Sequence, residues 1–353
     1  MKELLHILQQ VPQFPALVQA LETGQSPAAV SGLSRIHRAH FAAGLGTALD
    51  RPVVMVCADE DEAQALGRDI TAFTGWSVTL IGSREFNFYN GAVASHQGEH
   101  SRLAAFYAMA QGECKVITAT VEGLLQRTLS PEELLEHVVT ICSGGSYDPT
   151  QLADALAALG YTRCDQVEGV GQFALRGGIL DVFSPAQDHP VRVEFWDTDV
   201  DSMGLFDPAT QRRVGHLDKA VFLPVREVLP QRQEDGTWQQ VPDHQLPQRY
   251  PVAHTAVHHL PPDAVVCLSE SARVAERGKN WLWQLDEDLK TLVESGVQLG
   301  KHATFALTFP QLMEELSQFP LCFLDSFSTS TLPLPPKACL LYTSPSPRDP
   351  KTS

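Results

Sequence analysis

The chain has 353 residues and a formal net charge of −16, from 42 acidic and 26 basic side chains. This acidic balance argues against a general nucleic-acid surface, which needs clustered Lys and Arg to neutralise phosphates. The length is too great for one typical core and predicts two or three domains. No apolar run is long enough for a signal peptide or a membrane span, so we expect a cytoplasmic protein without a membrane partner.

The seven cysteines lie far apart, and none forms a CxxC pair of the kind that binds zinc or exchanges disulfides. Several stand within apolar runs such as VVMVCA and AVVCLS, where Cys behaves as a small buried hydrophobe. We therefore expect reduced thiols, as in a reducing cytosol.

Residues 1–143 alternate apolar, strand-like runs with helical periods. Strands that are apolar throughout and separated by helices indicate a parallel sheet covered on both faces. This region is therefore predicted to be an α/β domain that looks like a nucleotide-binding fold. The expected strands are 53–58, 77–82, 115–120 and 138–142, and the expected helices are 61–73, 98–111 and 121–127.

A P-loop requires GxxxxGK[ST], because its backbone N–H groups cradle the phosphates, its Lys reaches them and its hydroxyl holds Mg²⁺. Before the strand at 53–58 the chain offers AAVSGLSRIHRAHFAAGLG, which contains Gly32 and Ser34 but no Gly-Lys-Ser/Thr. This stretch cannot bind ATP-Mg²⁺ in the manner of a P-loop, and we expect no cofactor.

The segment His96-Gln97-Gly98-Glu99-His100 reads HxxEH, the inverted zincin signature, in which two histidines bind zinc and the Glu acts as base. Gly98 weakens a helix at this point, and no partner carboxylate helix follows downstream. His254 and His258 form a second pair at helical spacing, without the Glu. We expect these histidines to serve the core or the surface, and we predict no metal site.

Residues 160–206 show the pattern of a β-meander, after a predicted helix at 149–159. Alternation runs from 172 to 183, from 191 to 196 and again to 206. Because successive strand side chains take opposite faces, Arg192, Glu194 and Trp196 are expected on the face opposite Val191, Val193 and Phe195. In the first strand, Phe173, Leu175 and Ile179 are expected on one face and Arg176 on the other.

Arg176 and Arg192 are thus expected on one exposed sheet surface, for which two interpretations stand. The first is a solvated strand face with one spare aromatic residue. The second is a binding surface, because Arg and Trp are the residues that interface hot spots favour.

The runs FALRGGILDVF, PVRVEFWD and DSMGLFDPATQRR resemble, in order and spacing, domain 2 of the UvrB-like module of transcription-repair coupling factors (Mfd). The stretch 83–109 resembles the first domain of the same module, which has a degraded Walker A motif. The resemblance implies that this sheet docks UvrA, the damage-recognition ATPase of nucleotide excision repair. It places the family's two arginines at Arg176 and Arg192, a usual carboxylate at Glu194, and at Trp196 an aromatic that is commonly Phe.

The resemblance also implies an organisation in four parts. A degenerate nucleotide-binding domain 1a (1–143) is followed by an inserted α+β domain 2 with an antiparallel sheet (144–230). A domain 1b (231–336) completes the first domain, which is therefore discontinuous. Within it we expect a polar linker (231–248), strands at 264–268 and 321–324, and a helix at 270–295 whose Trp281 and Trp283 serve packing. Residues 337–353 do not resemble the family and are excluded from the fold as a non-native tail.

The implied function is that of a non-catalytic adaptor, which recruits UvrA to stalled RNA polymerase in transcription-coupled repair. RNA polymerase, DNA, ATP and Mg²⁺ would be bound only by further domains of the longer family chain. Two other classes remain open: an ATP-dependent DNA-binding enzyme of the UvrB type, against which the missing Gly-Lys-Ser/Thr argues, and a zinc hydrolase.

Overall fold

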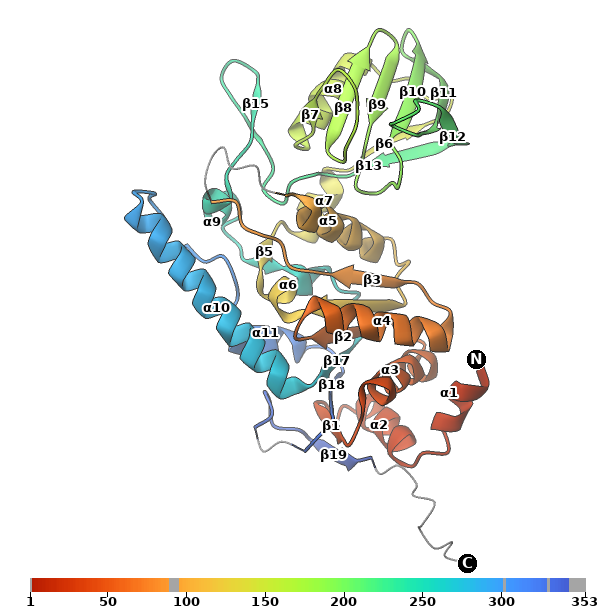
Figure 1. Cartoon of the computed structure of the whole chain (residues 1–353), viewed down its shortest axis with the longest axis vertical. Helices are drawn as coiled ribbons and strands as arrows, with labels where there is room; N and C mark the ends of the chain where they lie inside the picture. Colours follow the sequence, from red (N-terminus) through yellow and green to blue (C-terminus); the bar gives the residue numbers. More distant parts are fainter. Residues whose placement is uncertain (1, 89–94, 301–302, 329–330, 343–353) are drawn as a thin grey trace, which may run out of the picture.

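The computed structural model describes residues 2–88, 95–300, 303–328 and 331–342. It consists of a parallel sheet covered by helices and a separate, mostly antiparallel sheet above it (Figure 1). The predicted fold class, a discontinuous α/β domain with an inserted α+β domain, is confirmed.

The larger sheet has seven strands in the order β19-β1-β18-β17-β2-β4-β3, and each pair is parallel. Strands from both ends of the chain alternate in it, because β17 and β18 lie between β1 and β2. The strands are β1 (Ala28–Ser31), β2 (Val53–Cys57), β3 (Val78–Ile81), β4 (Val116–Thr120), β17 (Val265–Ser269), β18 (Leu321–Asp325) and β19 (Ala338–Leu341).

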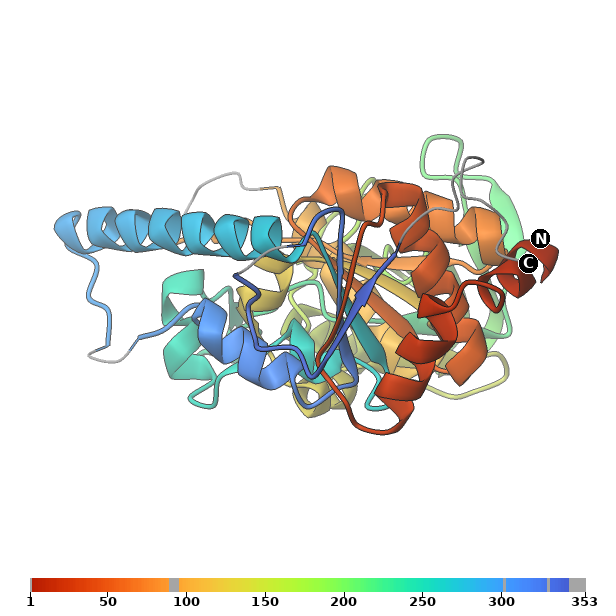
Figure 2. The ribbon, with the colours of Figure 1, turned by 90° about the horizontal axis from the view of Figure 1, so that it is seen from below.

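Two hydrophobic cores lie on opposite faces of this sheet. In β2, Val54 and Val56 face one core and Met55 faces the other, as strand alternation requires. The core around Met55 is covered by α1 (Lys2–Leu8), α2 (Gln13–Glu22), α3 (Arg35–Leu49) and α4 (Glu60–Thr74). The core around Val54 is covered by α5 (Gln97–Ala110), α6 (Val121–Leu125), α7 (Pro131–Glu136), α10 (Ser271–Glu294) and α11 (Phe309–Leu316). The far end of α10 extends beyond the body of the molecule (Figure 2).

The smaller sheet has six strands in the order β12-β11-β10-β9-β8-β7, and α8 (Pro149–Ala158) packs on one face of it. Leu156 of α8 contributes to a core with apolar side chains of the central strands, such as Leu180 and Val193. The strands are β7 (Thr162–Arg163), β8 (Gln172–Arg176), β9 (Ile179–Val182), β10 (Val191–Trp196), β11 (Asp199–Phe206) and β12 (Arg213–His216). The face directed away from α8 is called the outer face below.

Short elements complete the fold. They are β5 (Arg127–Thr128) with β16 (His254–Thr255), β14 (Gln231–Arg232) with β15 (Trp238–Gln239), the 3₁₀ turns Asp243–Gln245 and Ala256–His259, and α9 (Leu246–Arg249). The region 231–248, predicted as a polar linker, therefore contains a small hairpin, one 3₁₀ turn and most of α9.

Two strand predictions were wrong. The strand predicted at 138–142 is β6 (Val139–Cys142), but it pairs antiparallel with β13 (Lys219–Phe222) instead of joining the parallel sheet. The strand predicted from 172 to 183 is a hairpin, because the chain turns at Gly177, whose φ is +58°, and Gly178. Ile179 therefore lies opposite Arg176 on the outer face, and not with Phe173 in the core.

Three further differences concern element ends and the C-terminal segment. The helix predicted at 121–127 ends at Leu125, and Arg127 pairs with β16 instead. Neither β1 nor α3 was assigned from the sequence. The segment 337–353 was excluded from the fold, yet Ala338–Leu341 forms the edge strand β19 beside β1; residues 343–353 lie outside the described residues.

Candidate functional site: the outer face of the six-stranded sheet

The four side chains predicted as the site, Arg176, Arg192, Glu194 and Trp196, lie on the outer face. Strand register places Arg176 opposite Ile179, and places Arg192 opposite Asp181. Val191 and Val193, which alternate with Arg192 and Glu194, are buried in the core on the other face. The alternation predicted for residues 191–196 is therefore confirmed.

Asp181, which sequence reasoning missed, joins the two arginines. Its Oδ2 accepts from Arg176 Nη2 at 2.9 Å and from Arg192 Nη2 at 2.8 Å, while its Oδ1 accepts from Arg192 Nε at 2.7 Å. The Asp181 residue is only 1% exposed. A buried carboxylate needs such partners, because an unpaired buried charge is costly.

Arg192 is held on more sides than Arg176. Its Nη2 also donates to Oε1 of Gln211 at 2.8 Å, and its guanidinium lies 4.4 Å from the centre of the Phe206 ring. Gln211 itself occupies the left-handed region, with φ +59°. The hydrogen bonds to Asp181 raise the pKa of Arg192 above its usual value. The Arg192 guanidinium is thus a fixed, permanently charged group.

Glu194 belongs to a neighbouring polar cluster on the same face. Its Oε2 accepts from Ser202 Oγ at 2.8 Å, and its Oε1 lies 3.5 Å from Nη2 of Arg213. Arg213 in turn donates to Ser202 Oγ at 2.8 Å. Both charged side chains remain well exposed, so a partner can reach either one.

Trp196 stands at the end of β10 and is 80% exposed. The next residue, Asp197, turns the chain with φ +58°. Ile179, opposite Arg176, is a further large apolar side chain exposed on this face. Trp and Arg are both residue types that are enriched at interface hot spots.

The degenerate P-loop position lies at the carboxyl edge of the parallel sheet, between β1 and α3. Only Gly32, Leu33 and Ser34 connect these elements, whereas a P-loop needs a longer glycine turn. Gly32 has φ +91°, and a Cβ on it would meet the carbonyl oxygen of Tyr342 at 2.2 Å. The connection therefore has neither the length nor the room to cradle a triphosphate.

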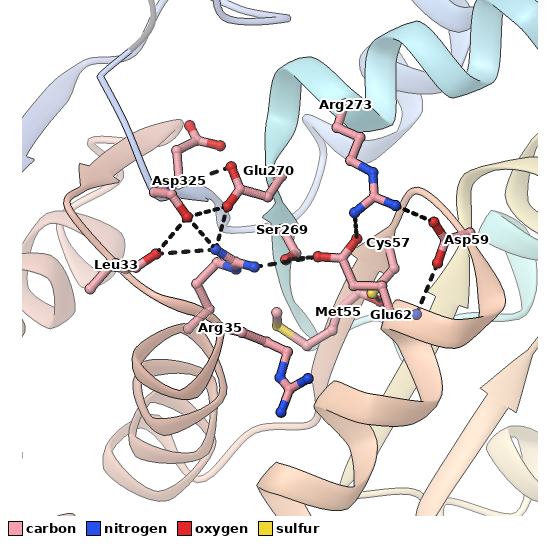
Figure 3. Close-up of polar contacts among 12 residues, drawn as sticks. Leu33, Arg35, Met55, Cys57, Asp59, Glu62, Ser269, Glu270, Arg273 and Asp325 are labelled. Atoms are coloured by element: carbon pink, nitrogen blue, oxygen red, sulfur yellow. Dashed lines mark hydrogen bonds and ion pairs between the residues drawn. The ribbon is translucent and has the colours of Figure 1, made fainter.

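Charged side chains of the protein fill this edge instead, and Figure 3 shows Glu62, Glu270 and Arg273 converging there. The buried Arg38 bonds to Glu270, to Ser326 Oγ at 2.8 Å, and lies 3.5 Å from Oε1 of Glu62. Burial raises the pKa of Asp325, which accepts from the backbone N–H of Ser271 at 2.6 Å. Carboxylates at this edge disfavour a polyphosphate anion.

The HxxEH segment serves the contact between the two sheets. Glu99 accepts from Arg226 Nε at 3.1 Å and from the backbone N–H of Glu227 at 2.5 Å, and His96 Nδ1 lies 3.1 Å from its Oε2. His100 packs against Gly171, and burial lowers its pKa to about 4. Within the described ranges, no three His, Cys, Asp or Glu side chains gather closely enough to hold a metal ion.

The second histidine pair is also engaged locally. His258 Nδ1 accepts from the backbone N–H of Thr255 at 3.1 Å, and its ring meets that of His254 edge to face.

Across the part of the chain that the structure describes, no helix is both long and apolar enough to cross a membrane.

Comparison with known proteins first identifies the type of domain that the six-stranded sheet belongs to. A family model described as the UvrB interaction domain matches residues 139–227, the segment that contains the six-stranded sheet. This segment is a UvrB interaction domain.

The longer comparison then gives the relatives. A transcription-repair-coupling factor of Myxococcus xanthus is 33% identical over 61% of this chain and 19% of its own length. That of Bacillus subtilis is 30% identical over 63% of this chain and 19% of its own. That of Staphylococcus aureus (strain USA300) is 24% identical over 88% of this chain and 30% of its own. The chain is thus similar to transcription-repair-coupling factors, and it spans between 19% and 30% of the length of these relatives.

Proposed function

We propose that this chain is an adaptor that binds UvrA through the outer face of its UvrB interaction domain and so brings excision repair to stalled RNA polymerase. One observation carries the proposal: Arg176, Arg192, Glu194 and Trp196 share one exposed face of the matched segment. In this proposal RNA polymerase and DNA are bound by other parts of the longer family chain.

The adaptor works without catalysis of its own. The connection between β1 and α3 is too short for a P-loop and lacks the Gly-Lys-Ser/Thr. Arg38 and its carboxylate partners occupy the edge where phosphates would lie. We therefore propose that the described domains need neither a nucleotide nor a metal.

The test is calorimetric titration of the chain with purified UvrA. We expect binding by the parent chain, and a loss in Arg176→Ala/Arg192→Ala of about 2–5 kcal/mol, as for truncated interfacial charge pairs. The matched control is Arg68→Ala/Arg163→Ala, which removes the same charge from exposed positions outside the outer face.

Two results would contradict the proposal. One is a folded parent chain that does not bind UvrA. The other is a loss below about 1 kcal/mol for the paired substitution, which would place both arginines at a rim. Titration with ATP-Mg²⁺ is expected to give no binding, and measurable affinity would favour the UvrB-type ATP-dependent enzyme instead. Zinc that co-purifies stoichiometrically would favour the hydrolase.

A further inference from the structure

The two arginines that Asp181 joins, Arg176 and Arg192, are not equivalent. An Arg side chain carries five N–H donors. Arg192 directs three of them to Asp181 and Gln211, and its side chain is 20% exposed. Arg176 directs one to Asp181, and its side chain is 51% exposed. Of these two arginines, Arg176 therefore keeps more hydrogen-bonding capacity for a partner.

Asp181 cannot itself meet a partner. Both of its oxygens are occupied by guanidinium groups, and the residue is buried beneath them. Its backbone position is fixed by β-pairing on both sides, opposite Ala174 of β8 and Arg192 of β10. The carboxylate is thus a rigid anchor beneath two longer and more flexible side chains.

We propose that Asp181 is the positioning residue of this surface: it locks Arg192 in place and aims Arg176 outward, so that Arg176 is the guanidinium that engages a carboxylate of the partner. Gln211 and Phe206 complete the support of Arg192. For the identity of the partner, this inference rests on the proposed binding of UvrA; the positioning itself does not.

Replacing Asp181 by Asn separates positioning from simple electrostatics, because the two explanations predict opposite changes in the affinity for the partner. The substitution keeps the shape and makes the face more positive by one charge. If long-range attraction governed affinity, an acidic partner would bind more tightly. If Asp181 positions Arg176, binding becomes weaker, since a side chain that must be ordered on binding loses entropy.

The experiment is a double-mutant cycle of Asp181→Asn and Arg176→Ala, measured by calorimetry with UvrA. We expect roughly tenfold weaker binding for Asp181→Asn and a larger loss for Arg176→Ala. The double variant should be within about twofold of Arg176→Ala alone, because coupled residues are not additive. Asp263→Asn is the control, an isosteric charge loss at an exposed position before β17, outside the six-stranded sheet, that should leave affinity unchanged.

A second readout needs no partner. In ¹⁵N spectra of the free chain, the Nε–H of Arg192 should exchange slowly with solvent, and Asp181→Asn should accelerate that exchange. Failure of the parent chain to bind UvrA would defeat the proposed function, while this measurement would still decide the positioning role. If Asp181→Asn does not fold, Arg192→Lys takes its place in the cycle, because Lys keeps the charge and loses the two-pronged geometry.

Three results would overturn the inference. They are unchanged or tighter binding by folded Asp181→Asn, additive losses in the cycle, and an Arg192 Nε–H exchange rate that does not respond to the substitution.

Discussion

Two regions of this molecule contain clusters of arginine and carboxylate, and they differ in whether the arginine reaches solvent. At the carboxyl edge of the parallel sheet, the arginine is buried: Arg38 is enclosed by Glu62 and Glu270. On the outer face of the six-stranded sheet, the carboxylate is buried and the guanidinium of Arg176 reaches solvent. The first arrangement pairs buried charges of both signs within the fold, whereas the second buries only the carboxylate and leaves guanidinium charge exposed to solvent. Only the second leaves charge that a partner could contact.

The largest effect on the free energy of unfolding is expected when the buried cluster around Arg38 is broken. Arg38→Ala leaves Glu62 without its buried cation and should destabilise the fold by about 3–5 kcal/mol. UvrA affinity of the remaining folded protein should not change. Denaturant unfolding measures the first quantity and calorimetry the second. Arg35→Ala is the control: its bond to Asp69 is exposed, so the cost should stay below about 1 kcal/mol. If Arg38→Ala and Arg35→Ala lost similar, small amounts of unfolding free energy, the contrast between the buried and the exposed arginine would be wrong.

A second prediction concerns the contact between the two sheets, where His100 lies against Gly171. Burial lowers its pKa to about 4 from 6.5, so the folded state keeps it neutral. Between these values the unfolded chain binds more protons. Stability is therefore lost as the pH falls from about 6.5 toward 4, by about 3 kcal/mol in all. His100→Gln should flatten the stability profile in this window, measured by denaturant unfolding at several pH values. The control His216→Gln, at an exposed position, should leave the stability profile unchanged.

The smallest effect on the fold is expected on the outer face itself. Trp196→Ala should leave the free energy of unfolding within about 0.5 kcal/mol, since the side chain is largely solvated. UvrA affinity should fall by roughly 2 kcal/mol, the scale of an aromatic hot spot. Trp283→Ala, which removes another exposed indole on α10, is the control for loss of apolar surface. Equal affinities of the two variants would show that Trp196 lies outside the interface.

The sequence predicts the parallel sheet well where strands are buried on both faces. VVMVC and VITAT read as continuous apolar runs, and they form β2 and β4. The strand at 138–142 reads in the same way, yet it joins another sheet, because pairing is decided by distant residues such as Ala220. Local pattern predicts that a strand exists and does not predict its neighbour.

The candidate site shows the same limit. Alternation along β10 correctly placed Arg192, Glu194 and Trp196 on one face. The turn at Gly177-Gly178 was overlooked, although Gly-Gly between two apolar runs is a hairpin signal. That turn moves Ile179 to the outer face and brings Asp181 beside Arg192. Asp181 was missed because an acidic residue between Leu180 and Val182 gives no local sign of the cations it will meet.

The pairing of β6 with β13 also has a consequence for how the protein is built. Cys142, at the end of β6, lies opposite Lys219, at the start of β13, and Ser143 donates to the carbonyl of Asp218 at 2.8 Å. The chain thus leaves and returns at one point, and a tight turn joining these two strands would close the gap as an ordinary hairpin. The six-stranded sheet is therefore an insertion, and the paired strands β6 and β13 connect it to the rest of the chain. One continuous insertion of this kind leaves the order of the strands in the parallel sheet unchanged.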